Sequence, residues 1–86
     1  MTIQLYLYTT SHCHLCEHAE SIVASLAHRY DMQWAKVEIA DDATLLELYE
    51  VKIPVLKRLD SGAEIGWPFN EIDVENLLMQ KISGQQ

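Results

Sequence analysis

The sequence predicts an α/β protein with a four-stranded mixed sheet and helices on both faces. Three observations predict this fold. The chain opens with a strand-like segment followed by a helix-like one, as a parallel crossover requires. A second strand-and-helix pair follows, and the last third carries a hairpin pattern and a final helix. The predicted order of elements is βαβαββα. We expect a single domain over residues 1–82, because 86 residues are too few for two hydrophobic cores, and a frayed tail at 83–86.

The first strand and helix are marked by a change of hydrophobic period. Residues Ile3 to Tyr8 are rich in β-branched, aromatic and leucine side chains, which predicts a buried strand. Thr9 to His12 is polar and turn-like. A helix to about His28 or Arg29 follows, because apolar residues then recur at helical spacing: Leu15, Ala19, Ile22, Val23 and Leu26.

The next strand and helix are shorter. Gln33 to Ile39 alternate, which predicts a strand with Ala35, Val37 and Ile39 on one face and Trp34, Lys36 and Glu38 on the other. Asp41 or Asp42 is expected to cap a short helix that carries Leu45, Leu46, Leu48 and Tyr49.

A hairpin and a capped helix complete the pattern. Pro54 begins a strand over Val55 to Leu59, the Asp60-Ser61-Gly62 turn reverses the chain, and Ala63 to Trp67 return antiparallel. Asn70, with Asp73 three residues later, predicts the start of the last helix. Its inward residues are expected to be Val74, Leu77, Leu78 and Ile82, with Lys81 and Gly84 at its C-terminal end.

The charge and hydropathy of the chain exclude some classes of function. Thirteen Asp and Glu residues against six Lys and Arg give a net charge of −7, which argues against nucleic-acid binding. No apolar run approaches the length needed to span a bilayer, and the first residues lack a basic leader. We therefore expect no nucleic-acid partner, no membrane partner and a cytoplasmic location.

The two cysteines point to redox chemistry. Cys13 and Cys16 are separated by two residues at a strand-to-helix junction, and so close a pair cannot staple a fold. A thiolate at Cys13 would be stabilised by the helix N-terminus, and Cys16, one turn further in, would be more shielded. We expect Cys13 to attack a disulfide in a protein or small-molecule thiol substrate and Cys16 to resolve the mixed disulfide. His14, when protonated, would tune the Cys13 pKa.

Three segments resemble the glutaredoxin-like branch of the thioredoxin superfamily: SHCHLCEHAE, VKIPVLKR and GWPF. The resemblance covers most of the chain and implies a thioredoxin-like fold and thiol–disulfide oxidoreductase activity. It also implies a cis-proline at Ile53-Pro54 that faces the cysteines, with the Ile53 backbone pairing with substrate or glutathione.

The sequence departs from glutaredoxins where they bind glutathione. Gly66 and Trp67, followed by Pro68, stand where a Gly-Gly pair is usual, so Trp67 fills space and Pro68 removes an N–H donor. The motif also lacks the usual proline and tyrosine. We expect no resident cofactor. Glutathione is kept as a candidate co-substrate, although these departures argue against its binding. Gly66 and Trp67 are candidate substrate-binding residues, and Trp67 is equally explained as a core aromatic residue.

Two other functions remain open at this point. One is zinc or iron–sulfur binding through Cys13 and Cys16, with the nearby His12, His14 and His18 as further ligands. Structural zinc sites generally use two separated pairs of ligands, and this chain has no second Cys or His pair. The sequence therefore favours redox chemistry over metal binding, and no residue is assigned as a metal ligand. The other is a non-catalytic adaptor that keeps the fold for binding.

Overall fold

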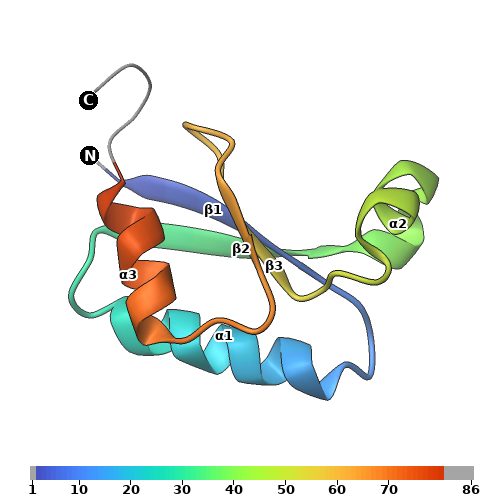
Figure 1. The fold of residues 1–86 in the computed structure, drawn as a ribbon, viewed down its shortest axis with the longest axis horizontal. Coiled ribbons are helices and arrows are strands. Elements are labelled where there is room, and N and C mark those ends of the chain that lie inside the picture. The colour runs from blue at the N-terminus through green and yellow to red at the C-terminus, as the bar shows by residue number, and fades with distance from the viewer. Residues whose placement is uncertain (1, 81–86) are drawn as a thin grey trace.

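A mixed sheet with strand order β2-β1-β3-β4 forms the centre of the computed structural model, which describes residues 2–80 (Figure 1). Its elements are β1 (Ile3–Thr9), α1 (His14–Leu26), β2 (Met32–Glu38), the 3₁₀ turn η1 (Ile39–Asp41), α2 (Ala43–Tyr49), β3 (Val55–Arg58), β4 (Glu64–Gly66) and α3 (Glu71–Met79). The predicted βαβαββα order is confirmed. The expected tail at 83–86 and the expectations for Lys81, Ile82 and Gly84 lie outside the described residues.

The register of the sheet brings three chain segments to one end. β1 is parallel to β2 and antiparallel to β3, and β3 is antiparallel to β4. Tyr8 lies opposite Val55, and Val55 lies opposite Gly66. Pro54 directly precedes Val55 and Trp67 directly follows Gly66. Both therefore lie at the end of the sheet from which β1 leads to Cys13.

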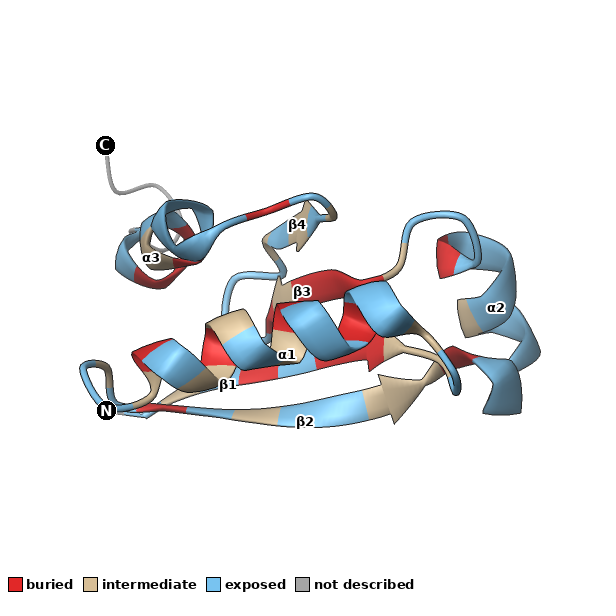
Figure 2. Cartoon of the chain, turned by 90° about the horizontal axis from the view of Figure 1, so that it is seen from below, coloured by how far each residue is buried: buried red, intermediate tan, exposed pale blue. Residues whose placement is uncertain are grey.

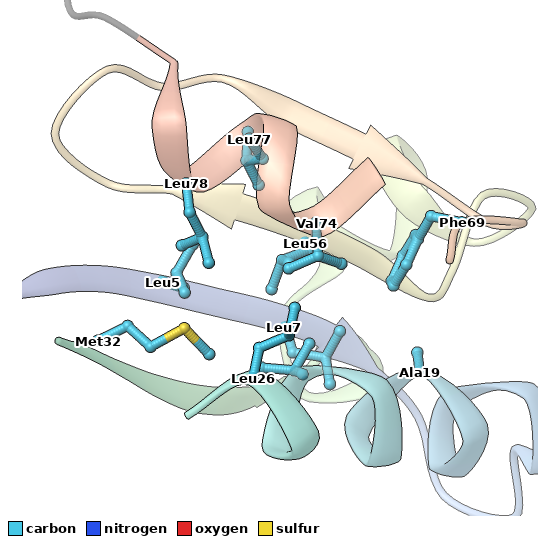
Figure 3. Close-up of a cluster of buried hydrophobic side chains, with 11 residues drawn as sticks. Leu5, Leu7, Ala19, Leu26, Met32, Leu56, Phe69, Val74, Leu77 and Leu78 are labelled. Atoms are coloured by element: carbon cyan, nitrogen blue, oxygen red, sulfur yellow. The ribbon is translucent and has the colours of Figure 1, made fainter. Parts of the chain in front are cut away.

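The main hydrophobic core lies between the sheet and helices α1 and α3 (Figure 3). Leu5 and Leu7 of β1 and Leu56 of β3 face the helices, because alternate residues of a strand share a face. The rest of this cluster is Ala19, Val23, Leu26, Met32, Phe69, Val74, Leu77 and Leu78. The inward positions predicted for α3 within the described residues are confirmed.

A second, smaller core covers the opposite face of the sheet and holds α2. It consists of Tyr8, Ile39, Tyr49 and Val55, with the Tyr8 and Tyr49 rings stacked at 4.4 Å between centroids. The Tyr49 hydroxyl donates a hydrogen bond to Glu64, and this bond raises the tyrosine pKa. Much of α2 is exposed (Figure 2). Leu46 and Leu48 are among its exposed residues, so only part of the apolar surface of α2 packs against the sheet.

The ends of the helices follow local hydrogen bonding. Asp42 caps α2 by accepting from the N–H groups of Thr44 and Leu45, and Asn70 forms a capping box with Asp73 at the start of α3. The expected end of α1 near His28 or Arg29 is too late. The Ala27 and Arg29 N–H groups bond to the carbonyl of the third residue before them, which is a tighter turn than the α-helix makes, and α1 ends at Leu26. No helix among the described residues is both long and apolar enough to cross a bilayer.

The hairpin contains a buried arginine that its sequence pattern did not predict. β3 ends at Arg58, one residue before the expected end, and the Arg58 side chain reaches the C-terminal end of α3. One guanidinium nitrogen donates to the carbonyl oxygens of Leu77 and Leu78, each at 2.9 Å, and of Gln80 at 3.1 Å. Asp60 pairs with the other side of the guanidinium at 2.8 Å. Arg58 therefore donates to carbonyl oxygens at the C-terminal end of α3, where the helix supplies few N–H partners.

The turn between β3 and β4 contains a glycine whose positive φ makes a substitution costly. Gly62 has a φ of +77°, and a Cβ added there would meet no heavy atom within 4 Å. Gly62→Ala is therefore expected to lower the free energy of unfolding by about 1 kcal/mol through backbone strain alone. The control is Gly66→Ala, whose Cβ would make an ordinary contact at 4.0 Å with the Lys52 carbonyl oxygen. Equal urea midpoints for the two variants would contradict this explanation.

Candidate active site

Cys13 and Cys16 form a disulfide across the first turn of α1. Their Cα atoms are 5.2 Å apart, within the roughly 4.4–6.8 Å that a disulfide requires. Cys13 is the N-cap residue of α1, and its sulfur accepts a hydrogen bond from the Cys16 N–H at 3.1 Å. Cys16 is only 4% exposed, whereas Cys13 is half-buried. The two sulfurs are thus unequal in their access to solvent.

This arrangement favours one cysteine as the attacking group. A thiolate on Cys13 would lie at the positive end of the helix dipole and accept a backbone N–H, and both effects stabilise the anion over the thiol. His14 is the first residue of α1 and is exposed, next to Cys13 in the chain. The geometry therefore suits an accessible thiolate with a shielded partner one turn away.

The loop before Cys13 is attached to the end of β2 through Glu38. One Glu38 oxygen accepts from the Ser11 hydroxyl at 3.2 Å, and the other accepts from the Ala40 N–H at 3.1 Å. A hydrogen bond from the Thr10 side chain and that from Ala40 lower the Glu38 pKa, so this carboxylate is ionised at neutral pH. His12 within the loop adopts a left-handed conformation with a φ of 61°. Glu38 thus helps to hold the segment that presents Cys13.

A pocket of about 360 Å³ opens beside the disulfide on the β2 side. Its charged lining consists of Glu17 and Glu20 from α1 and Lys36 and Glu38 from β2, and its remaining lining is Thr9, Thr10, Ser11, His12, Cys13 and Cys16. Lys36 pairs with Glu20 at 3.4 Å. Sequence reasoning missed this pocket, although the alternation of β2 had placed Lys36 and Glu38 on one face.

The two proline-containing connections lie at the end of the sheet from which β1 leads to Cys13. The Trp67 N–H donates to the Pro54 carbonyl oxygen at 3.0 Å, and both the Ile53-Pro54 and Trp67-Pro68 peptide bonds are cis. The centroids of the Trp67 ring and of the His18 imidazole of α1 are 5.3 Å apart. The Trp67 side chain also packs on the main core. The structure therefore brings Trp67 to α1 and to Pro54 at the same time.

One of the two backbone groups of Ile53 is already bonded within the fold. Its N–H already donates to the Tyr49 carbonyl oxygen at 3.1 Å, and its side chain packs against the second core. Within residues 2–80 its own carbonyl oxygen accepts no backbone hydrogen bond. Of the two Ile53 backbone groups, the carbonyl is the one available to a ligand.

The histidines around the cysteines do not gather into a cluster. Within residues 2–80, no group of three or more His, Cys, Asp or Glu side chains is arranged to hold a metal ion. His18 instead contacts Trp67.

Comparison with known proteins agrees with the fold. Residues 4–79 match the glutaredoxin-like domain family (DUF836). The crystal structure of protein XcR50 from X. campestris is 34% identical with a TM-score of 0.75, over 86% of this chain and 93% of that one. The solution structure of Ne2328 from Nitrosomonas europaea is 24% identical with a TM-score of 0.77, over 91% and 92% of the two chains, and supports the fold alone. No curated protein matches the chain.

Proposed function

Because the chain belongs to the glutaredoxin-like domain family (DUF836), we propose that it is a thiol–disulfide oxidoreductase with Cys13 as nucleophile and Cys16 as resolving cysteine. The observation that carries the proposal is the unequal pair at the start of α1. Cys13 is at the N-cap and accessible, and Cys16 is buried one turn further along. A nucleophile needs access to its substrate, whereas a resolving thiol has to reach only its neighbour.

The reaction starts from the reduced protein. The Cys13 thiolate attacks one sulfur of the substrate disulfide, the substrate S–S bond breaks, and the other half of the substrate leaves as a thiolate that takes up a proton. Cys16 then loses its proton and attacks the Cys13 sulfur, which releases the second substrate thiolate. Two electrons pass to the substrate, and the protein is left with the Cys13–Cys16 disulfide.

The other candidate residues are proposed to contact the substrate around this pair. His14 tunes the charge near Cys13, and the Ile53 carbonyl accepts a hydrogen bond from the substrate backbone. Pro54, Gly66 and Trp67 form the wall on the β3–β4 side, where the Trp67 ring offers an apolar surface. The substrates are disulfides of proteins or small thiols, with glutathione as a candidate co-substrate, and the setting is the cytoplasm, where thiols are kept reduced.

Removal of the resolving cysteine tests these roles. Cys16→Ser is expected to accumulate a mixed disulfide at Cys13 with a model disulfide peptide, because no second thiol completes the exchange. Intact-protein mass spectrometry would detect one bound peptide half per chain, released again by dithiothreitol. If Cys16→Ser bound no peptide while the wild-type protein reduced it, Cys13 would not be the nucleophile.

A further inference from the structure

The pocket on the β2 side of the disulfide has a reactive bond in its wall and excess negative charge. Cys13 and Cys16 both line it, so a group that occupies the pocket lies next to the sulfur that reacts. Its three glutamates face a single lysine, and that lysine is paired with Glu20. Glu17 has no cation within ion-pair distance among residues 2–80, and the charged form of Glu38 is stabilised by hydrogen bonds.

The rest of the molecule strengthens this polarity. Asp41 and Asp42 follow Glu38 by three and four residues, and both are exposed, so they add negative charge just beyond the end of β2. The two arginines lie elsewhere: Arg29 follows the C-terminal end of α1 and pairs with Glu75 of α3, and Arg58 lies beneath the C-terminal end of α3. With a net charge of −7, the chain therefore presents its disulfide within a negative field.

We propose that this pocket selects cationic disulfide substrates, in which a lysine or arginine side chain next to the cystine enters the pocket beside Glu17 and Glu38. This inference rests on the proposed function and names its substrate class. A basic side chain that enters the pocket holds the substrate disulfide close to the Cys13 thiolate, which then attacks it as described above. Glutathione disulfide carries more carboxylate than ammonium groups, so the same field repels it.

The test is a single-turnover reaction of the pre-reduced full-length protein with three disulfide peptides of equal length. Lysine, glutamine or glutamate flanks the cystine in each, and formation of the Cys13–Cys16 disulfide is followed by rapid acid quench and thiol alkylation. At low ionic strength we expect the lysine peptide to react at least about 10-fold faster than the glutamate peptide. The difference should shrink to about 2-fold in 0.5 M salt, because salt screens the field.

A matched pair of variants locates the effect. Glu17→Gln removes a pocket charge, and Glu47→Gln removes an equal charge from an exposed position of α2 outside the pocket. We expect Glu17→Gln to reduce the lysine-to-glutamate rate ratio by about 3-fold or more, and Glu47→Gln to leave it nearly unchanged. The peptide series on the wild-type protein is informative even if a variant fails to fold.

The outcomes separate the two proposals. Reduction of all three peptides at equal rates, or fastest reduction of the glutamate peptide, overturns the substrate class and leaves the oxidoreductase proposal standing. An equal loss of preference in both variants overturns the role of the pocket. If none of the peptides is reduced, and glutathione disulfide is not reduced either, the oxidoreductase function itself is wrong.

Discussion

Cys13→Ser is expected to abolish disulfide reduction completely. A serine hydroxyl stays protonated at neutral pH even at a helix N-terminus, so the position would lose its nucleophile while keeping a hydrogen-bond acceptor for the Cys16 N–H. Cys16 cannot take over, because it is 4% exposed. The measurement is the rate at which pre-reduced protein cleaves a model disulfide peptide, compared with the rate in buffer alone.

Two controls make this result specific. Ser11→Ala changes a hydroxyl in the same loop without touching either sulfur, and is expected to retain measurable activity. Circular dichroism should show that Cys13→Ser keeps its helices, since a bridge that closes so short a loop contributes little to folding. Activity of Cys13→Ser above the buffer rate would show that the assigned roles of the two cysteines are wrong.

Arg58→Met is expected to have the largest effect on stability. The substitution leaves the carbonyl oxygens of Leu77, Leu78 and Gln80 without the donor that they share. Hydrogen bonds to a charged group contribute roughly 1.5–3 kcal/mol each and are not additive, so we expect a loss of about 3 kcal/mol in the free energy of unfolding. In a domain of this size that corresponds to a fall in Tm of about 12–24 °C.

Neighbouring variants separate burial from charge. Lys57→Met removes the same charge one residue earlier, from a half-buried side chain, and is expected to cost little. Asp60→Asn weakens the partly exposed ion pair while leaving the carbonyl contacts, so a loss below about 1 kcal/mol is expected. Thermal unfolding followed by circular dichroism compares all three. Similar losses for Arg58→Met and Lys57→Met would show that the bonds to α3 contribute nothing.

The sequence predicted the parts of this fold that depend on local pattern. The alternation in β2 is confirmed on both faces, because Trp34 and Lys36 reach Glu20 of α1 whereas Val37 packs into the second core. The Asn70 capping box was readable because both partners lie within one helical turn. The Cys13–Cys16 disulfide was predictable for the same reason, since three residues on a helix fix the distance between the two Cα atoms.

What the sequence did not predict depends on segments distant in the chain. Arg58 was unremarkable in a strand pattern, and its role depends on where α3 ends, about 20 residues later. The acidic pocket joins Glu17 and Glu20 to Lys36 and Glu38 from a strand that follows α1, so no local spacing reveals it. One local contact also went unpredicted: the turn after α2 brings the Ile53 N–H to the Tyr49 carbonyl oxygen, four residues earlier.

The strand order β2-β1-β3-β4 also bears on self-association through the sheet. An outer strand offers unpaired backbone groups that a second chain can adopt as a template, and long apolar outer strands are the most hazardous. Here β4 contributes just three residues to its edge, and the longer edge on β2 carries Lys36 and Glu38 near its end. Docking a further strand on β2 would bring a foreign chain against these charged side chains. Neither edge strand, β2 or β4, therefore favours aggregation through the pairing of strands from different molecules.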